Sequence, residues 1–342
     1  MGKLISRRVF NRSILAATGG AISAPAIFTS PARAAEFTIR FAHNAPVGFP
    51  THIRAQQAAE RIKQATGGRV NLLIFPNNQL GSDPEMLSQV RSGAIQMYAL
   101  PGLLAQSIVP DAGIHCLAFS FKSYDDLWPA IDGPLGAFIR ASMDKIGIKT
   151  FATPLDNGFR QITSRDKPIF TPADLAGFKI RTAPSPIIIS IFEHLGAATT
   201  TVSIKETYAA LQTKLVDGEE NPLPTIDAFK FYEVQKNCAL TNHVWDGFWF
   251  CVNPAYWEKL PPDLQHVVES NMNEAAKQQR QDLALFNESV AKKLAAAGLK
   301  MNQPDIGAFR QKLRESGFYD KWRKSFSEQG WTALEQAVGK LG

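Results

Sequence analysis

The sequence predicts an α/β protein whose two lobes close on a hinge like a clamshell. Strand-like and helix-like segments alternate from residue 36 onwards, which favours βαβ units and a mostly parallel sheet. Residues 35–342 have an ordinary globular composition and suffice for two domains. A helical pattern opens at Pro261-Pro262 and runs to about residue 297. Because this is longer than one small domain needs, we expect it to brace both lobes.

The first 34 residues have the features of an export signal. Arg7 and Arg8 precede a weakly apolar run at 13–28, and the segment ends in an Ala-x-Ala site at Ala34. The run is shorter than the roughly 20 apolar residues that span a bilayer. We therefore expect a twin-arginine signal that is cleaved after Ala34. The segment holds five basic residues and no acidic one, so the 37 basic and 31 acidic residues become 32 and 31. A mature charge of about +1 gives no electrostatic argument for nucleic acid or an anionic membrane.

The first block of the chain extends to residue 146. Residues 37–41 alternate in polarity, as in a half-buried strand, and 70–75 and 95–100 are further strand candidates. Apolar residues at helical spacing predict a helix before Gly67-Gly68 and another at 85–92. A helical stretch at 124–146 is interrupted at Gly133-Pro134.

The second block begins near Gly158. Residues 160–164 and 178–182 predict strands, and 205–215 predicts a helix that Asp217-Gly218 terminates. Residues 245–252 form an aromatic, strand-like segment. We expect one lobe from 35–157 with a return over about 247–286, and the other from 158–246 with about 287–342. In open α/β sheets, ligands bind beyond the carboxyl ends of the strands, here between the lobes.

Arg181 stands at the end of the predicted strand 178–182. Pro184 and Pro186 stiffen the following loop, and a helix is expected from about Ile187. A guanidinium held in this way can donate two parallel hydrogen bonds to a ligand carboxylate. The alternative is an ordinary structural role, in which Arg181 pairs with an acid such as Asp174 or caps a helix.

Other chemistry has weaker support. The common nucleophile, metal and nucleotide motifs are absent from the sequence, which lowers the odds of an enzyme without excluding one. Cys116, Cys238 and Cys251 are best explained as small buried apolar residues. His43 and His52 have no carboxylate at ligand spacing, so we expect loop or helix-surface histidines, no metal and no cofactor.

Long segments of the sequence resemble one family. They are "FAHNAPVGFPTH", "FPNNQLGSDPEMLSQVRSGAIQM", "GFRQITSRDKPIFTPADLAGFKIRTAPSP", "ETYAALQTKLVDGEENPLPTIDAFKFYEVQKNCALTNH" and "NPAYWEKLPPDLQHVV". They are similar to the substrate-binding proteins of tripartite ATP-independent periplasmic (TRAP) transporters, the DctP family. The resemblance covers nearly all of the mature chain. It implies a type II periplasmic-binding-protein-like clamshell, a periplasmic location and TRAP membrane subunits as partners.

The resemblance also implies a ligand site. Its K-[IL]-R arginine, which binds the substrate carboxylate, matches Arg181, and its G-x-R arginine matches Arg160, a second and variable contact. Asn221 matches the asparagine of D-G-E-E-N-P-L, and Asn44 matches one that reaches in from the other lobe. For Arg160 an interlobe ion pair stays open, and for Asn221 a turn-forming role does.

The sequence departs from the family pattern at positions that set the polarity and the aromatic content of the cleft. Leu100-Pro101-Gly102 stands where polar selectors are common in the first lobe, and this segment offers no charged side chain to the cleft. Either Trp245 or Phe248 is a candidate to stack on the ligand, although such residues, like Trp249, are more often core. Pro101 and Asn157 complete the candidate ligand contacts. Few polar groups favour a small, partly apolar carboxylate.

Two polar features near the site receive structural explanations. We expect a hydrogen-bonded structural role for His243. Glu219 and Glu220 are adjacent on a strand, so they should point to opposite faces and cannot both serve one site.

These observations predict a monomeric solute receptor that delivers a small organic carboxylate to TRAP membrane subunits, without chemistry on the ligand. The rival hypotheses are a twin-arginine-exported enzyme that carries a cofactor, and a binding protein for another transporter or a sensor.

Overall fold

The computed structural model describes residues 34–341. Residues 35–342 form a compact unit of their own. The predicted export signal, apart from Ala34, lies outside the described residues. Within the described part of the chain, no helix combines the length and the apolar character needed to cross a bilayer.

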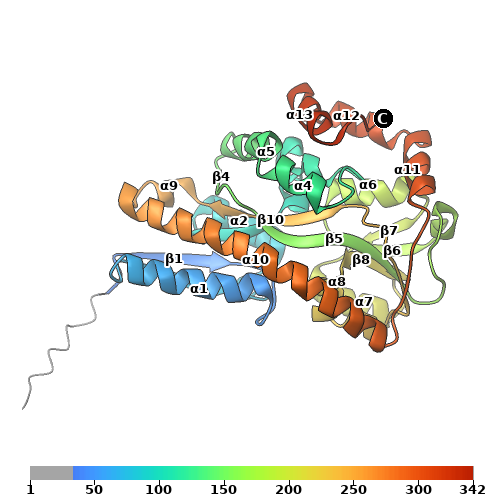
Figure 1. Ribbon diagram of the computed structural model, residues 1–342, viewed down its shortest axis with the longest axis horizontal. Coiled ribbons are helices and arrows are strands. Elements are labelled where there is room, and N and C mark those ends of the chain that lie inside the picture. Colours follow the sequence, from blue (N-terminus) through green and yellow to red (C-terminus); the bar gives the residue numbers. More distant parts are fainter. Residues whose placement is uncertain (1–33, 342) are drawn as a thin grey trace, which may run out of the picture. The chain divides into compact units, whose positions relative to one another are not determined.

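A mixed β-sheet runs through this unit (Figure 1). The order of the main strands is β2-β1-β3-β10-β5-β8-β6-β7, with β4 beside β10 and β9 between β5 and β11. The strands are β1 (Phe37–Ala42), β2 (Val70–Phe75), β3 (Met97–Pro101), β4 (Lys149–Thr150), β5 (Leu155–Ser164), β6 (Lys179–Thr182), β7 (Ala198–Thr201), β8 (Gly218–Pro222), β9 (Asn237–Ala239), β10 (Trp245–Val252) and β11 (Lys300–Asn302).

The expectation of a mostly parallel sheet was wrong. β1 is parallel to β2 and β3, and β6 is parallel to β7 and β8. The long strands β5 and β10 lie between these two groups and are antiparallel to each other, to β3 and to β8. Strand and helix alternation predicts only local crossovers. It does not show that β10 returns to pair Trp245 with Phe159 of β5.

The helices follow the predicted order. The break at Gly133-Pro134 separates two helices because the proline ring suits the first turn of the second helix and not the interior of the first. The α-helices are α1 (Pro50–Ala65), α2 (Asp83–Ser92), α3 (Gly102–Ala105), α4 (Tyr124–Ile131), α5 (Pro134–Asp144), α6 (Pro186–His194), α7 (Ile204–Gln212), α8 (Leu223–Ala228), α9 (Pro254–Trp257), α10 (Pro262–Ala296), α11 (Ile306–Glu315), α12 (Phe318–Ser325) and α13 (Glu328–Val338), with 3₁₀ turns at Pro110–Cys116, Pro172–Leu175 and Phe231–Glu233.

The long helix α10 connects two apolar cores, as the sequence predicted (Figure 1). Its first half packs Val268 and Met272 against residues of α1, β1 and β10. Its second half packs Val290 and Leu294 with residues of α7 and α8. Arg54 of α1 forms a bidentate ion pair with Asp282 of α10, at 2.6 and 2.7 Å. α10 therefore holds elements from both ends of the sheet.

The C-terminal helices continue this bracing. α11 and α12 contact α6, whereas α13 contacts α4 and α5. The last segment thus touches elements on both sides of the predicted lobe boundary, and the lobe limits given above remain a prediction. The three cysteines are buried and unbonded to one another, which confirms the expectation that they fill apolar space.

Candidate functional site

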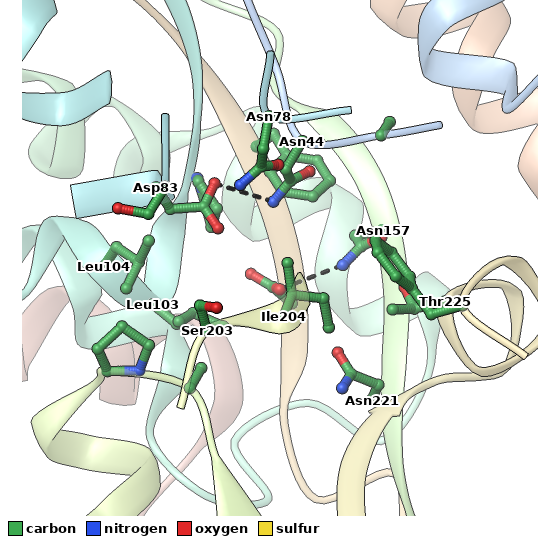
Figure 2. Close-up of a pocket in the computed structure, with 18 of the residues that line it drawn as sticks. Asn44, Asn78, Asp83, Leu103, Leu104, Asn157, Ser203, Ile204, Asn221 and Thr225 are labelled. Carbon is green, nitrogen blue, oxygen red and sulfur yellow. Dashed lines mark hydrogen bonds between the residues drawn. The ribbon is translucent and has the colours of Figure 1, made fainter. Parts of the chain in front are cut away.

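A cavity of about 320 Å³ lies where strands from both ends of the sheet terminate (Figure 2). One wall comes from the segments after β1 and β3 and from the start of α2. The opposite wall comes from the segments that follow β6, β7 and β8. This is the place at which ligands bind in open α/β sheets, and the volume suits a small molecule.

Most of the residues singled out from the sequence line this one cavity. Asn44 and Pro101 lie on the first wall, and β5, β6, β8 and β10 supply the rest. The predicted residues that line the cavity are Asn44, Pro101, Asn157, Arg160, Arg181, Asn221 and Phe248.

Trp245 does not line the cavity, which corrects one candidate. Its side chain is only 1% exposed, and its indole Nε1 donates to Asp156 Oδ1 at 2.8 Å. The pairing of β10 with β5 shifts register between Asp246 and Gly247, so simple alternation along the strand does not decide which aromatic side chain faces the ligand space. Phe248 is the one on the cavity wall.

Arg181 has the arrangement that a carboxylate clamp needs. Its side chain is 2% exposed, and both Nε and Nη2 donate to the backbone carbonyl of Val202, at 3.0 and 2.8 Å. Among residues 34–341, no carboxylate oxygen lies within the 4.0 Å of an ion pair with its guanidinium. Burial lowers its pKa to about 10, although Glu220 and Glu219 oppose this shift. Asp174, the suggested structural partner, instead accepts from the backbone of Phe170 and Thr171.

Arg160 is bound by the protein's own acids. Its Nε donates to Glu220 Oε2, its Nη2 to Glu220 Oε1 at 2.9 Å, and its Nη1 to Asp246 Oδ2 at 3.0 Å. Burial alone would lower the pKa of Arg160, but the two carboxylates more than offset it and raise the pKa. Arg160 lines the cavity, yet its charge is already compensated.

The side-chain amide of Asn221 connects Arg160 to Glu219. Its side-chain oxygen accepts from Arg160 Nη2 at 3.1 Å, and its Nδ2 donates to Glu219 Oε2 at 2.6 Å. Burial raises the pKa of Glu219 to about 7. The side chain of Asn221 is therefore held by other side chains and does not form the turn that was the alternative.

The two adjacent glutamates have separate partners, as expected for neighbours on a strand. Glu219 accepts from Thr163 and Asn221, whereas Glu220 accepts from Arg160. His243 lies 3.3 Å from Glu220 through Nε2 and 2.7 Å from the Thr241 hydroxyl through Nδ1. The hydrogen-bonded structural role predicted for His243 is confirmed.

The first wall carries an acid that sequence reasoning did not identify. Asp83, at the start of α2, lines the cavity, and its Oδ1 accepts from Asn44 Nδ2 at 3.1 Å (Figure 2). The same oxygen accepts from Tyr98 Oη at 2.7 Å. Burial raises the pKa of Asp83, and these hydrogen bonds counteract the rise. The prediction considered only Leu100-Pro101-Gly102 on this lobe. It overlooked the helix start that the fold brings alongside.

Asp246 is the second acid that sequence reasoning missed. Its Oδ2 accepts from Arg160 and, at 3.2 Å, from Asn157 Nδ2, the bond drawn from Asn157 in Figure 2. Burial raises its pKa to about 6, although Arg160 opposes the shift. A signal existed, because Asp246 is the one acid in an otherwise apolar and aromatic strand. A buried acid needs a partner and often marks a site.

The remainder of the lining is largely apolar. Phe49 and Phe229 join Phe248 as aromatic contacts, and short polar side chains are added by Asn78, Ser203 and Thr225. The full apolar set is Ala45, Pro46, Phe49, Pro84, Pro101, Leu103, Leu104, Ala183, Pro184, Val202, Ile204, Ala228, Phe229 and Phe248.

A hydrogen bond joins the segments that form the two walls of the cavity. Lys205, near the start of α7, donates its Nζ to the backbone carbonyl of Asn78 at 2.8 Å. Asn78 follows β2, on the wall that Asn44 and Asp83 form. The two walls are therefore in direct contact in this structure.

His43 lies in the loop after β1, one of the two expected positions, whereas His52 lies in α1 and is buried instead of lying on the helix surface. They are 1% and 4% exposed, and His52 Nδ1 lies 3.3 Å from His43 Nε2. Burial lowers the pKa of His43 to about 3. Within residues 34–341, no group of three or more His, Cys, Asp or Glu side chains is placed to hold a metal ion.

Comparisons with known proteins place the chain in a family. The model of "Bacterial extracellular solute-binding protein, family 7" (DctP) matches residues 41–329. The uncharacterized protein y4mM of Sinorhizobium fredii is 35% identical over 82% of this chain, which spans only 51% of that longer relative. The C4-dicarboxylate-binding periplasmic protein DctP of Rhodobacter capsulatus is 33% identical, over 78% of this chain and 80% of that protein.

A solved structure gives the same result at the level of the fold. A TRAP periplasmic solute-binding protein from Sulfurospirillum deleyianum, with bound succinate, aligns with a TM-score of 0.82 and 30% identity, over 89% of this chain and 99% of that one. Together with the family match over most of the sequence, this shows that the chain belongs to the DctP family of bacterial extracellular solute-binding proteins and has their two-lobed type II fold.

Proposed function

We propose that this protein is a periplasmic receptor that binds a small organic carboxylate through Arg181 and delivers it to the membrane subunits of a TRAP transporter. The observation that carries the proposal is the buried Arg181 guanidinium, which lines the cavity and, among residues 34–341, donates only to the carbonyl of Val202. A buried cation without a counter-ion is unfavourable, so an incoming carboxylate would remove an existing penalty. A planar, preorganised fork also loses little entropy when it binds.

The remaining polar residues have supporting roles in this proposal. Arg160 acts mainly through Asn221, because its own donors are occupied by Glu220 and Asp246. Asn44 and Asn157 face the cavity from its two sides and orient the acids Asp83 and Asp246. Phe248 covers an apolar part of the ligand.

Closure of the lobes explains how binding is signalled to a partner. A ligand that touches both walls stabilises the closed arrangement over the open one, because only the closed arrangement offers all its contacts. The contact of Lys205 with Asn78 would then form together with the ligand contacts. The TRAP membrane subunits would recognise the closed form, and the receptor would act as a monomer.

Calorimetry on the purified mature protein tests this proposal. We expect at least one small carboxylate, with succinate as the reference probe, to bind with a Kd near the micromolar range, or about −8 kcal/mol. Arg181→Met should abolish binding of every such carboxylate. Arg54→Met is the matched control, because Arg54 pairs with Asp282 outside the cavity lining. Unchanged binding in the Arg181 variant would disprove the proposed clamp.

A further inference from the structure

Asp246 presents an acceptor that no protein donor satisfies. The residue is 2% exposed, and only its Oδ2 is engaged, by Arg160 and Asn157. Among the residues that the structure describes, Oδ1 has no hydrogen-bond partner. Buried carboxylate oxygens are normally paired, and Asp246 lines the cavity. A donor on the bound ligand would complete its hydrogen bonding.

The charges around the cavity favour a donor that carries positive charge. The charges that line the cavity away from bulk solvent, or pair directly with the lining, are two cations, Arg160 and Arg181, and three acids, Asp83, Asp246 and Glu220. Arg160 is already paired with Glu220 and Asp246, whereas Asp83 forms no ion pair among residues 34–341, although the charge of Arg181 lowers its pKa from a distance. A ligand with only a carboxylate would add to this excess of negative charge. A ligand that carries an ammonium group as well would leave the balance unchanged.

Two further observations agree with a cationic group near Asp246. Phe248 lies two residues along β10 and lines the same cavity, so an aromatic ring, a group that attracts cations, lies near Asp246. Burial raises the pKa of Asp246 to about 6, as expected where nearby positive charge is insufficient. Five other charged or titratable groups interact electrostatically with Asp246. They are Arg160 of β5, Glu220 of β8, Asp83 of α2, Tyr98 of β3 and Cys116 of the turn at Pro110–Cys116.

From this arrangement we infer that the ligand is an amino acid in the broad sense, with a carboxylate for Arg181 and a positively charged nitrogen for Asp246. The inference rests on the proposed function, because it assumes that Arg181 binds the carboxylate. It goes further by assigning the opposite end of the ligand. Asp246 thereby becomes the residue that selects a zwitterion over a simple organic acid.

Matched sets of small acids test this inference by calorimetry on the mature protein. One set is 4-aminobutanoate, 4-hydroxybutanoate and pentanoate, which differ only in an ammonium, hydroxyl or methyl terminus. Two further sets, one carbon shorter and one carbon longer, allow for the distance between Arg181 and Asp246. Succinate is included as the reference acid without nitrogen. At about pH 7.5 we expect the best ammonium-bearing acid to bind about tenfold or more tightly than its hydroxyl and methyl counterparts. Asp246→Asn should remove that preference, because it should weaken binding of the ammonium-bearing acid and strengthen binding of the methyl counterpart, which prefers an uncharged side chain at this position.

A pH comparison on the unaltered protein provides a second measurement that does not depend on the variant's folding. An ammonium group needs Asp246 ionised, so its affinity should rise between about pH 5.5 and 7.5. A nitrogen-free acid prefers Asp246 protonated, so its affinity should fall over the same range.

The outcomes separate this inference from the proposed function. If succinate or a hydroxyl or methyl acid binds as tightly as every ammonium-bearing acid, and Arg181→Met abolishes that binding, the receptor function stands and the zwitterion inference is wrong. An ammonium preference that survives Asp246→Asn also overturns it. If none of these carboxylates binds, both proposals fail.

Discussion

Replacement of Arg181 by methionine should separate ligand binding from stability, because the buried charge supports ligand binding and lowers the stability of the empty protein. Burial lowers the pKa of Arg181 from 12.5 to about 10. Since one pKa unit corresponds to about 1.4 kcal/mol, the charged side chain destabilises the empty protein by about 3 kcal/mol relative to its solvated state. Methionine keeps an unbranched apolar stem and removes the charge. It also removes the two hydrogen bonds to Val202, which contribute about 1 kcal/mol each.

The two contributions therefore nearly cancel, and the empty variant should unfold within a few degrees of the unaltered protein. Ligand binding should behave differently. Truncation of one partner of a buried, hydrogen-bonded charge pair costs about 2 to 5 kcal/mol, or roughly 30-fold to several-thousand-fold in Kd. Arg181→Lys should recover little of this affinity, because an ammonium group cannot reproduce the two parallel hydrogen bonds.

Calorimetry and thermal unfolding of the same preparations measure both quantities. The expected pattern is lost ligand heat, a nearly unchanged unfolding midpoint and a missing ligand-induced rise in that midpoint. Arg54→Met should bind ligand normally, since Arg54 lies on the α1–α10 contact. Ligand affinity within about threefold of normal in Arg181→Met would refute the reasoning, since this difference is below 1 kcal/mol.

Three further outcomes follow from other buried or bridging groups. Arg160→Met should lower the free energy of unfolding in urea by about 3 to 5 kcal/mol, because Glu220 and Asp246 would lose their buried counter-charge. A decrease below about 1 kcal/mol would show that the ion pairs contribute little to stability. Burial raises the pKa of Glu219 from 4.5 to about 7, so between these pH values the folded protein holds a proton that the unfolded chain releases. The free energy of unfolding should therefore fall as the pH rises from about 4.5 to 7, and Glu219→Gln should flatten this slope. Identical pH profiles of stability in the two proteins would contradict this prediction. Lys205→Met should weaken ligand affinity several-fold, because it removes a hydrogen bond that joins the two lobes in the closed arrangement. The ligand-saturated variant should also be less compact in small-angle scattering. Unchanged affinity would mean that the bond from Lys205 to Asn78 plays no part in closure of the lobes.

Local sequence signals account for most of the secondary structure. Strand alternation at 37–41 and the aromatic run at 245–252 both became strands, and Pro261-Pro262 precedes the long helix α10. Such features depend on side-chain periodicity and on the fixed backbone of proline, which act within a few residues. The strand directions at the centre of the sheet were not accessible in this way, because they depend on a pairing between β5 and β10 across about ninety residues of chain.

The candidate site likewise has features that the sequence determined and features that only the tertiary structure determined. The chain by itself determined that Arg181 ends a strand before a stiffened loop, and motif resemblance marked Arg160, Asn221 and Asn44 as its companions. Only the tertiary structure decided which charges are already compensated, since Arg160 pairs with Glu220 and Asp246 whereas Arg181, within the described part of the chain, donates to a carbonyl alone. It also decided that Asp83 and Asp246 line the same cavity and that Trp245 does not. The physical reason is that burial and electrostatic pairing arise between distant segments, so no window of sequence contains them.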